Sequence, residues 1–185
     1  SAVGTDVIIV NEDATLTIEG DGTIEAVSGN DGYAIIADGK VIINGGKIKS
    51  GIDQNNEPNA VVYARNNGKV YVNGGIFPNE HNSKFVLNKK DAHRATTTIE
   101  VRGGKFYNFN PQNNAAEGDN TNFLAEGYRV SELEGHWYLV TEESTAYVSK
   151  ASQLVAANDD SKVKVIMLCK GEFGTIVAAS NKTYI

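Results

Sequence analysis

Neighbouring carboxylates are the residues of this chain whose types could support catalysis. Glycoside hydrolysis requires two carboxylates held roughly 5 to 10 Å apart, and the sequence contains the pairs Asp159–Asp160 and Glu142–Glu143. The first pair stands between an expected helix and an expected strand, and the second stands in an expected linker. Both positions are typical of solvated turns. The sequence therefore predicts no catalytic residue and a protein that is not an enzyme.

The histidines and the aspartates near turns do not form a metal-binding pattern. A zinc site needs four converging ligands, whereas His81, His93 and His136 form no closely spaced pair. The aspartates near turns lack the glycine-rich nonapeptide repeat that binds calcium in some solenoids; they are Asp13, Asp21, Asp31 and Asp38. No glycine loop leads into a helix, as a phosphate site would require. We predict no metal and no cofactor.

One short sequence pattern, or phrase, recurs along the first half of the chain and predicts the strands and turns of the fold. Each copy is an alternating strand, a polar residue, a glycine turn and a second short strand; the copies are Leu16–Ile24, Val41–Ile48, Val70–Phe77 and Ile99–Phe106. The second glycine of the turn stands at 22, 46, 75 and 104, which gives steps of 24, 29 and 29 residues. Repeats of this length made of strands and turns indicate a solenoid.

A third strand precedes each copy of the phrase, at Val7–Val10, Tyr33–Ala37, Ala60–Ala64 and Lys84–Leu87. We therefore expect an all-β fold, a right-handed parallel β-helix with three strands per rung. Ile43, Val72 and Val101 share one phase of the repeat and should stack as a buried ladder. An antiparallel sandwich also uses many short strands, but it gives no reason for one phrase to recur in register.

Outward positions of the same strands supply a candidate interaction surface. Ile42 and Tyr71 alternate with buried residues, so they should form an apolar patch outside the solenoid, although isolated apolar residues are common on protein surfaces. Aromatic residues of the corners and loops are the groups expected to stack on sugars; they are Tyr33, Tyr63, Tyr107 and Phe109. The predicted interaction residues are Ile42, Tyr71, Tyr33 and Tyr63.

The regular repeat stops after Phe106. Residues 107–141 should cover the open end of the rungs at about 5–106, with a hairpin of Gly127–Val130 and His136–Val140 and with Trp137 and Tyr128 as packing residues. Residues 142–185 should hold a linker, a helix over Ser149–Asn158 capped by Ser149 or Ser152, and the first strands of a second module. We expect the first domain to span 1–141 and the chain to be a piece of a longer protein.

The closing segment of the first domain resembles a known module. Gly103–Phe106, Asn110–Pro111, Phe123–Val130 and Gly135–Val140 are similar to the end of pectate-lyase-like β-helix modules in bacteriophage structural proteins and gut-bacterial surface proteins. The insertion Gln112–Asn122 departs from that pattern. The resemblance implies a non-enzymatic structural or adhesive module of a phage head or tail fibre, with attachment to a surface glycan and a homo-oligomer, such as a trimer, or other virion proteins as partners.

Two other functions stay open: a bacterial cell-surface adhesin, and a non-catalytic part of a polysaccharide depolymerase or lyase. All three place the protein in a virion or at the cell surface. The formal net charge of −6 argues against nucleic acid and anionic membranes as partners. No apolar run approaches the ~18 residues that a membrane span requires, and the single cysteine, Cys169, is interpreted as a small buried apolar residue.

Overall fold

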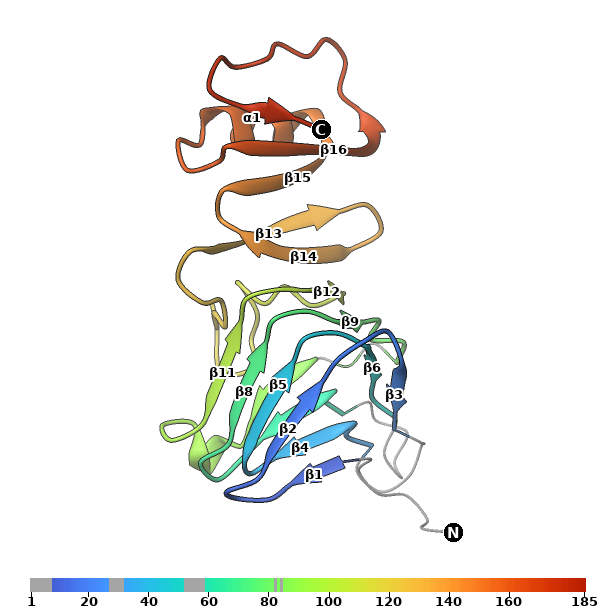
Figure 1. Ribbon diagram of the computed structural model, residues 1–185, viewed down its shortest axis with the longest axis vertical. Helices are drawn as coiled ribbons and strands as arrows, with labels where there is room; N and C mark the ends of the chain where they lie inside the picture. Colours follow the sequence, from blue (N-terminus) through green and yellow to red (C-terminus); the bar gives the residue numbers. More distant parts are fainter. Residues whose placement is uncertain (1–7, 27–31, 52–58, 82, 84) are drawn as a thin grey trace.

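The computed structural model describes residues 8–26, 32–51, 59–81, 83 and 85–185, and over these residues the fold is a right-handed parallel β-helix with further elements stacked on one end (Figure 1). Val7 and Lys84, which open two of the expected strands, lie outside the described residues. The fold class predicted from the repeat is confirmed. No helix among the described residues is long and apolar enough to cross a membrane.

Each rung contributes one strand to each of three sheets. The first sheet holds β1 (Ile8–Val10), β4 (Ile35–Ala37), β7 (Val62–Ala64) and β10 (Leu87–Lys89). The second holds β2 (Thr15–Ile18), β5 (Lys40–Ile43), β8 (Lys69–Val72) and β11 (Thr98–Val101). The third holds β3 (Thr23–Glu25), β6 (Lys47–Lys49), β9 (Ile76–Phe77) and β12 (Gly104–Tyr107). A 3-10 helix, η1 (Asp91–His93), lies between β10 and β11.

Inward side chains form the ladders that the repeat predicts. Ile43 pairs with Val72, and Val72 pairs with Val101, and all three are fully buried. Ile18 begins this ladder opposite Ile43. A strand alternates its side chains between two faces, so the same strands send Thr17, Ile42, Tyr71 and Glu100 outward in one row. The expected inside and outside of the solenoid are therefore confirmed.

The glycine pairs at one corner of the rungs have two separate causes. A Cβ atom on Gly74 would lie 2.4 Å from the carbonyl oxygen of Asn44 in the rung below, so the first glycine is needed for close stacking. Gly75 has a φ of 95°, a conformation that L-residues with side chains rarely adopt. Beside this corner Asn73 donates a side-chain hydrogen bond of 2.9 Å to Asn44. Close stacking at the first position and a positive φ at the second thus select the recurring Gly-Gly.

The strand expected at Lys84–Leu87 begins three residues later, as β10. Val86 stays buried, but its carbonyl oxygen accepts hydrogen bonds from both Val61 and Val62. The same arrangement recurs one rung below, where the carbonyl oxygen of Val61 accepts hydrogen bonds from Ala34 and Ile35, so two consecutive side chains face the core in each of these rungs, such as Val86 with Leu87. Strict alternation along the sequence does not anticipate this arrangement.

The segment after Phe106 covers all three sheets at the last rung. The side chain of Glu117 accepts the backbone N–H of Lys89 in β10 at 2.7 Å. Phe123 and Ala125 exchange backbone hydrogen bonds with Val101 in β11. The hairpin of β13 (Tyr128–Leu133) and β14 (Trp137–Glu142) pairs antiparallel with β12. The predicted hairpin cap is confirmed, and the polar insertion is itself part of the cap.

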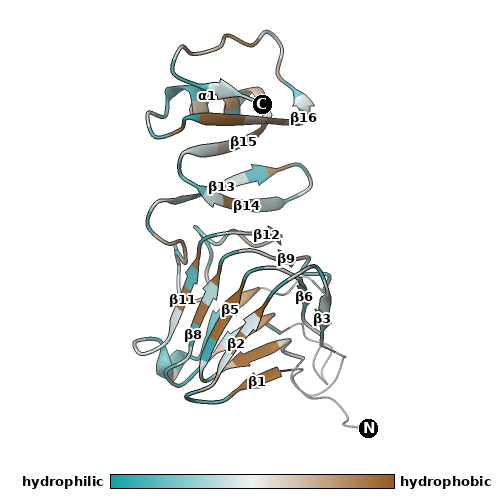
Figure 2. Cartoon of the chain, in the orientation of Figure 1, coloured by the Kyte–Doolittle hydropathy of each residue, from teal (hydrophilic) through white to brown (hydrophobic). Residues whose placement is uncertain are grey.

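A second, smaller unit follows the hairpin. Its strands β15 (Thr145–Lys150), β16 (Val165–Glu172) and β17 (Thr183–Tyr184) are parallel, and α1 (Ala151–Asp159) connects the first two. Figure 2 shows strong apolar colouring along β16, whereas the hairpin below it is paler. Leu154 and Ala157 of α1 pack into this unit's own core of Ala146, Val148, Val163 and Ile166.

Three details of this unit differ from the sequence expectations. The expected linker contains a full strand, β15. Neither serine caps the helix; instead Gln153 accepts the backbone N–H groups of Ser149 and Lys150, at 2.7 and 3.1 Å. Cys169 is half-buried rather than buried, because it lies in the part of β16 beyond the small core.

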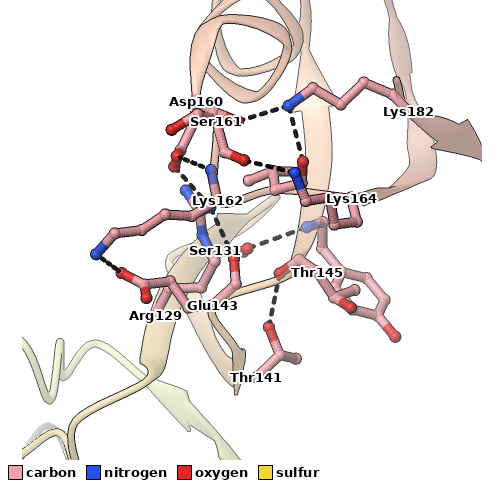
Figure 3. A network of polar contacts seen from close by, with 12 residues as sticks. Arg129, Ser131, Thr141, Glu143, Thr145, Asp160, Ser161, Lys162, Lys164 and Lys182 are labelled. Atoms are coloured by element: carbon pink, nitrogen blue, oxygen red, sulfur yellow. Dashed lines mark hydrogen bonds and ion pairs between the residues drawn. The ribbon is translucent and has the colours of Figure 1, made fainter. Parts of the chain in front are cut away.

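Side chains join the hairpin to the second unit (Figure 3). β13 and β15 lie beside one another but do not pair as strands in the described structure. Instead, Ser131 accepts the backbone N–H of Tyr147 at 3.0 Å, and Arg129 pairs with Asp160 at 3.0 Å. The junction therefore interrupts the backbone ladder that runs through the solenoid.

Candidate functional site

A largely apolar groove of about 580 Å³ lies on the outer face of the third sheet, where the last rungs meet the hairpin; it is lined by Lys47, Ile76, Pro78, Glu80, Lys105, Tyr107 and Trp137. Strand register explains why these residues gather. Lys47 pairs with Ile76, and Ile76 pairs with Lys105, so the three side chains form one outward row. Ile76 lies between the two lysines and keeps 45% of its surface exposed.

The aromatic wall of this groove comes from the junction of β12 with the cap. Tyr107 is opposite Trp137 in the antiparallel pair, and their ring centroids are 5.2 Å apart with planes inclined by 55°. The ammonium group of Lys105 lies 4.6 Å from the centre of the indole ring of Trp137. A cation at this position is attracted by the negative face of the ring. The groove therefore offers a partly exposed aromatic surface with a positive charge beside it.

Ion pairs at the other side of the groove involve two neighbouring lysines and one carboxylate. Glu80 accepts Lys49 at 2.9 Å and lies 3.6 Å from Lys47. The hydrogen bond from Lys49 lowers the pKa of Glu80 and raises the pKa of Lys49. Lys105 makes no ion pair with any residue that the structure describes. The unpaired positive charge in this groove is thus at its aromatic end.

A second groove, of about 680 Å³, lies over the first sheet and the cap loop. Tyr33 and Tyr63 line it and stack on each other, with ring centroids 4.8 Å apart and planes inclined by 14°. Asn88 is opposite Tyr63 in the neighbouring strand, and its buried Oδ1 atom has no hydrogen-bond partner in the described structure. Burial and the negative charge of Asp91 raise the pKa of the Tyr63 hydroxyl.

Beside this second groove, Arg94 joins two carboxylates that are far apart in the sequence, Asp91 of the groove lining and Glu117 of the cap loop. Arg94 contacts Asp91 and Glu117, with distances of 2.8 Å to each. The cap loop folds Glu117 back beside η1, an arrangement that the spacing of these residues in the sequence does not reveal. Burial raises the pKa of Glu117, although hydrogen bonding to Lys89 opposes the shift. The carboxylate of Glu117 is engaged by Lys89 and Arg94 and holds the cap.

The predicted interaction residues fall on two different faces. Ile42 and Tyr71 are neighbours on the second sheet, where Lys40 and Arg102 each lie 5.6 Å from the ring centre of Tyr71. Tyr33 and Tyr63 lie in the first-sheet groove instead, so the four residues do not form one surface.

Among the loop aromatics, the structure separates Tyr107 from Phe109. Tyr107 lines the third-sheet groove, whereas Phe109 is buried against Phe106 and is not part of that groove. Trp137, expected only as a packing residue of the cap, is the main aromatic wall of that groove. Trp137 reaches Tyr107 because β14 pairs with β12 in this register, and the sequence alone does not predict that register.

One residue of each acidic pair and one of the three histidines have structural partners. Asp160 and Glu143 are not simply solvated, because they form ion pairs with Arg129 and Lys162 across the junction. His93 accepts the backbone N–H of Asn66 at 2.7 Å. Within the part of the chain that the structure describes, no three potential metal ligands converge.

No family model matches the sequence, and neither a curated protein nor a solved structure is similar enough to it to indicate kinship.

Proposed function

We propose that the chain is a non-enzymatic structural and adhesive module of a bacteriophage fibre, and that it holds surface glycans in the third-sheet groove. The virion origin is supported by the resemblance of the closing segment to fibre modules. The adhesive role is supported by one observation, the wall of Tyr107 and Trp137 beside the exposed Ile76. Ligand sites are typically concave and mostly apolar, with a few polar groups.

Sugar rings suit this groove because each has an apolar face of C–H groups and a rim of hydroxyl groups. The apolar face would pack on the indole ring, and Lys47 and Glu80 would meet hydroxyl groups at the rim. The sheet supplies a rigid base, since each strand that carries groove residues, β6, β9, β12 and β14, is paired with another strand on both sides. The module would therefore present the groove without rearrangement.

Trp137 is the single tryptophan of the chain, so its intrinsic fluorescence reports on this groove directly. A panel of bacterial surface oligosaccharides titrated into the full chain should include ligands that change the emission of Trp137. Tyr107→Ala should weaken that binding, whereas Tyr71→Ala, an aromatic deletion on the second sheet, should leave it unchanged. A panel that leaves the emission unchanged at millimolar concentration, with calorimetry also flat, would overturn the adhesive role.

The homo-oligomer that the resemblance implies is part of the same proposal. Light scattering of the full chain after size-exclusion chromatography should give the mass of a trimer. A monomer at high concentration would remove the oligomer from the proposal but would leave the groove and its ligand unaffected.

A further inference from the structure

We infer that the third-sheet groove selects carboxylated sugars, and that Lys105 is the residue that discriminates them from neutral ones. This inference rests on the proposed glycan binding and adds the chemical class of the ligand. It comes from the position of one ammonium group relative to one indole ring, 4.6 Å from its centre.

Lys105 differs from the other lysine of the groove in its partners. Lys47 lies 3.6 Å from Glu80, whereas Lys105 has no carboxylate partner in the described structure. A lysine ammonium has three hydrogen-bond donors, and the ring face of Trp137 uses none of them fully. The groove lining contains two lysines and one carboxylate, a local charge of +1, in a chain whose net charge is −6. An anion is therefore attracted to this groove and repelled by the chain as a whole.

Lys105 also covers part of the surface on which a sugar would pack. A neutral sugar that packs on Trp137 displaces the ammonium group and gives it no charged partner in return. A carboxylated sugar displaces it as well, but its carboxylate then forms an ion pair with Lys105. The contact between Lys105 and Trp137 thus weakens the binding of neutral ligands, because they displace it without replacing it. With an acidic ligand, a stronger ion pair between Lys105 and the ligand's carboxylate takes its place.

Register limits where the carboxylate lies. Lys47 and Lys105 are two strands apart in the same outward row, which places their backbones about 10 Å apart. Ile76 fills the space between them. A ring packed on Trp137 has Lys105 beside it, while Lys47 and Glu80 are within reach of the next residue of an oligosaccharide.

Matched ligands and matched variants test the inference. Oligogalacturonates and their fully methyl-esterified forms have the same skeleton and differ in charge, and other acidic oligosaccharides can be compared with their neutral amides. The acids should bind about three- to fivefold more tightly, the range that an exposed ion pair supports. Lys105→Met should abolish this preference and strengthen the binding of neutral sugars, because the ammonium group no longer covers the indole ring. Lys69→Met, which removes an exposed lysine of the second sheet, should leave the preference intact.

Quenching of Trp137 fluorescence tests the same charge without a sugar. Iodide should quench more than caesium does, relative to neutral acrylamide, and Lys105→Met should remove the difference. Equal binding of acids and neutral forms, or a Lys105→Met variant that loses both equally, would overturn the inference while leaving the proposed function standing. If no acidic or neutral sugar binds, the proposed function and this inference both fail.

Discussion

The rings of Phe77 and Phe106 lie parallel, with their centroids 4.6 Å apart and their planes inclined by 2°. This separation matches the spacing of neighbouring strands, about 4.8 Å, so that side chains of consecutive rungs stack directly on one another. A single residue inserted into β12 before Phe106 would turn the ring outward. The phase of each strand is therefore fixed by the core, whereas this stacking does not fix the number of residues in the loops between strands.

Val72→Asp should lower the free energy of unfolding by about 4 kcal/mol or more, because it places a carboxylate in a fully buried ladder without a partner. Thr17→Asp, on the exposed face of the same sheet, should cost less than about 1 kcal/mol. Thermal and urea denaturation of the two variants would measure both changes. Equal midpoints for the two would mean that the inward and outward faces are assigned wrongly.

Gly74→Ala should destabilise the protein by about 1 to 3 kcal/mol, because its Cβ atom would lie 2.4 Å from the carbonyl oxygen of Asn44. Gly22→Ala is the matched control. A Cβ atom there has no neighbour within 4 Å, so the change should lie within about 0.5 kcal/mol of neutral. Chemical denaturation separates the two cases; a neutral Gly74→Ala would show that the rungs stack less closely than described.

The regular part of this fold can be predicted from the sequence because the cause of each repeated residue is local. The phase of Ile43, Val72 and Val101 follows from alternation, and the glycine turn follows from stacking and backbone geometry. The cap depends instead on contacts between segments far apart, such as Lys89 with Glu117. No periodicity encodes such contacts. The candidate site shares this property, since Trp137 reaches Tyr107 only through the reversal of the chain in the hairpin.

The pH dependence of stability should contain a contribution from Glu117. Its pKa in the folded state is raised above the ordinary value of 4.5, mainly by burial, so the protonated form is favoured by folding. The stabilisation of the folded state by protonated Glu117 is therefore present at pH below about 4.5 and is lost as the pH rises through the higher folded pKa. Glu117→Gln keeps an acceptor for Lys89 but does not titrate. Its melting temperature should therefore rise relative to that of the parent between pH 4.5 and neutrality. A relative fall over that range would mean that the ion pair with Arg94 outweighs burial.

We expect no glycosidic bond cleavage from the Asp91 and Glu117 pair, because Arg94 contacts both carboxylates and Glu117 is committed to the cap. Release of reducing sugars from acidic and neutral polysaccharides should stay at the level of a buffer control. Activity that disappears in Asp91→Asn, a change at a largely exposed side chain, would contradict this and would identify the first-sheet groove as an active site.

The junction between the hairpin and the second unit should respond to Arg129→Met. Arg129 donates to Asp160 at 3.0 Å and to the carbonyl oxygen of Glu143 at 3.3 Å, so its loss leaves two contacts unmade. Hydrogen exchange of β15 amides should become faster, while amides of β5 and β8 should be unaffected. Arg102→Met, which removes a surface ion pair with Glu100, serves as the control. Unchanged exchange in β15 would show that apolar packing alone holds the junction.

The shared register of the rungs allows a whole repeat to be removed without disturbing the inward ladders. Ile43 and Val72 occupy the same position in consecutive rungs, and each is followed by an asparagine. Deleting residues 44–72 would join Ile43 to Asn73 and keep the inward ladders in phase, because a whole repeat of 29 residues is removed. The cap pairs with strands of the last rung, β11 and β12, and bonds to Lys89 of β10, so it would accept either length. The length of the solenoid can therefore change by whole rungs, each of which adds or removes about 4.8 Å along its axis, while the same cap closes its end.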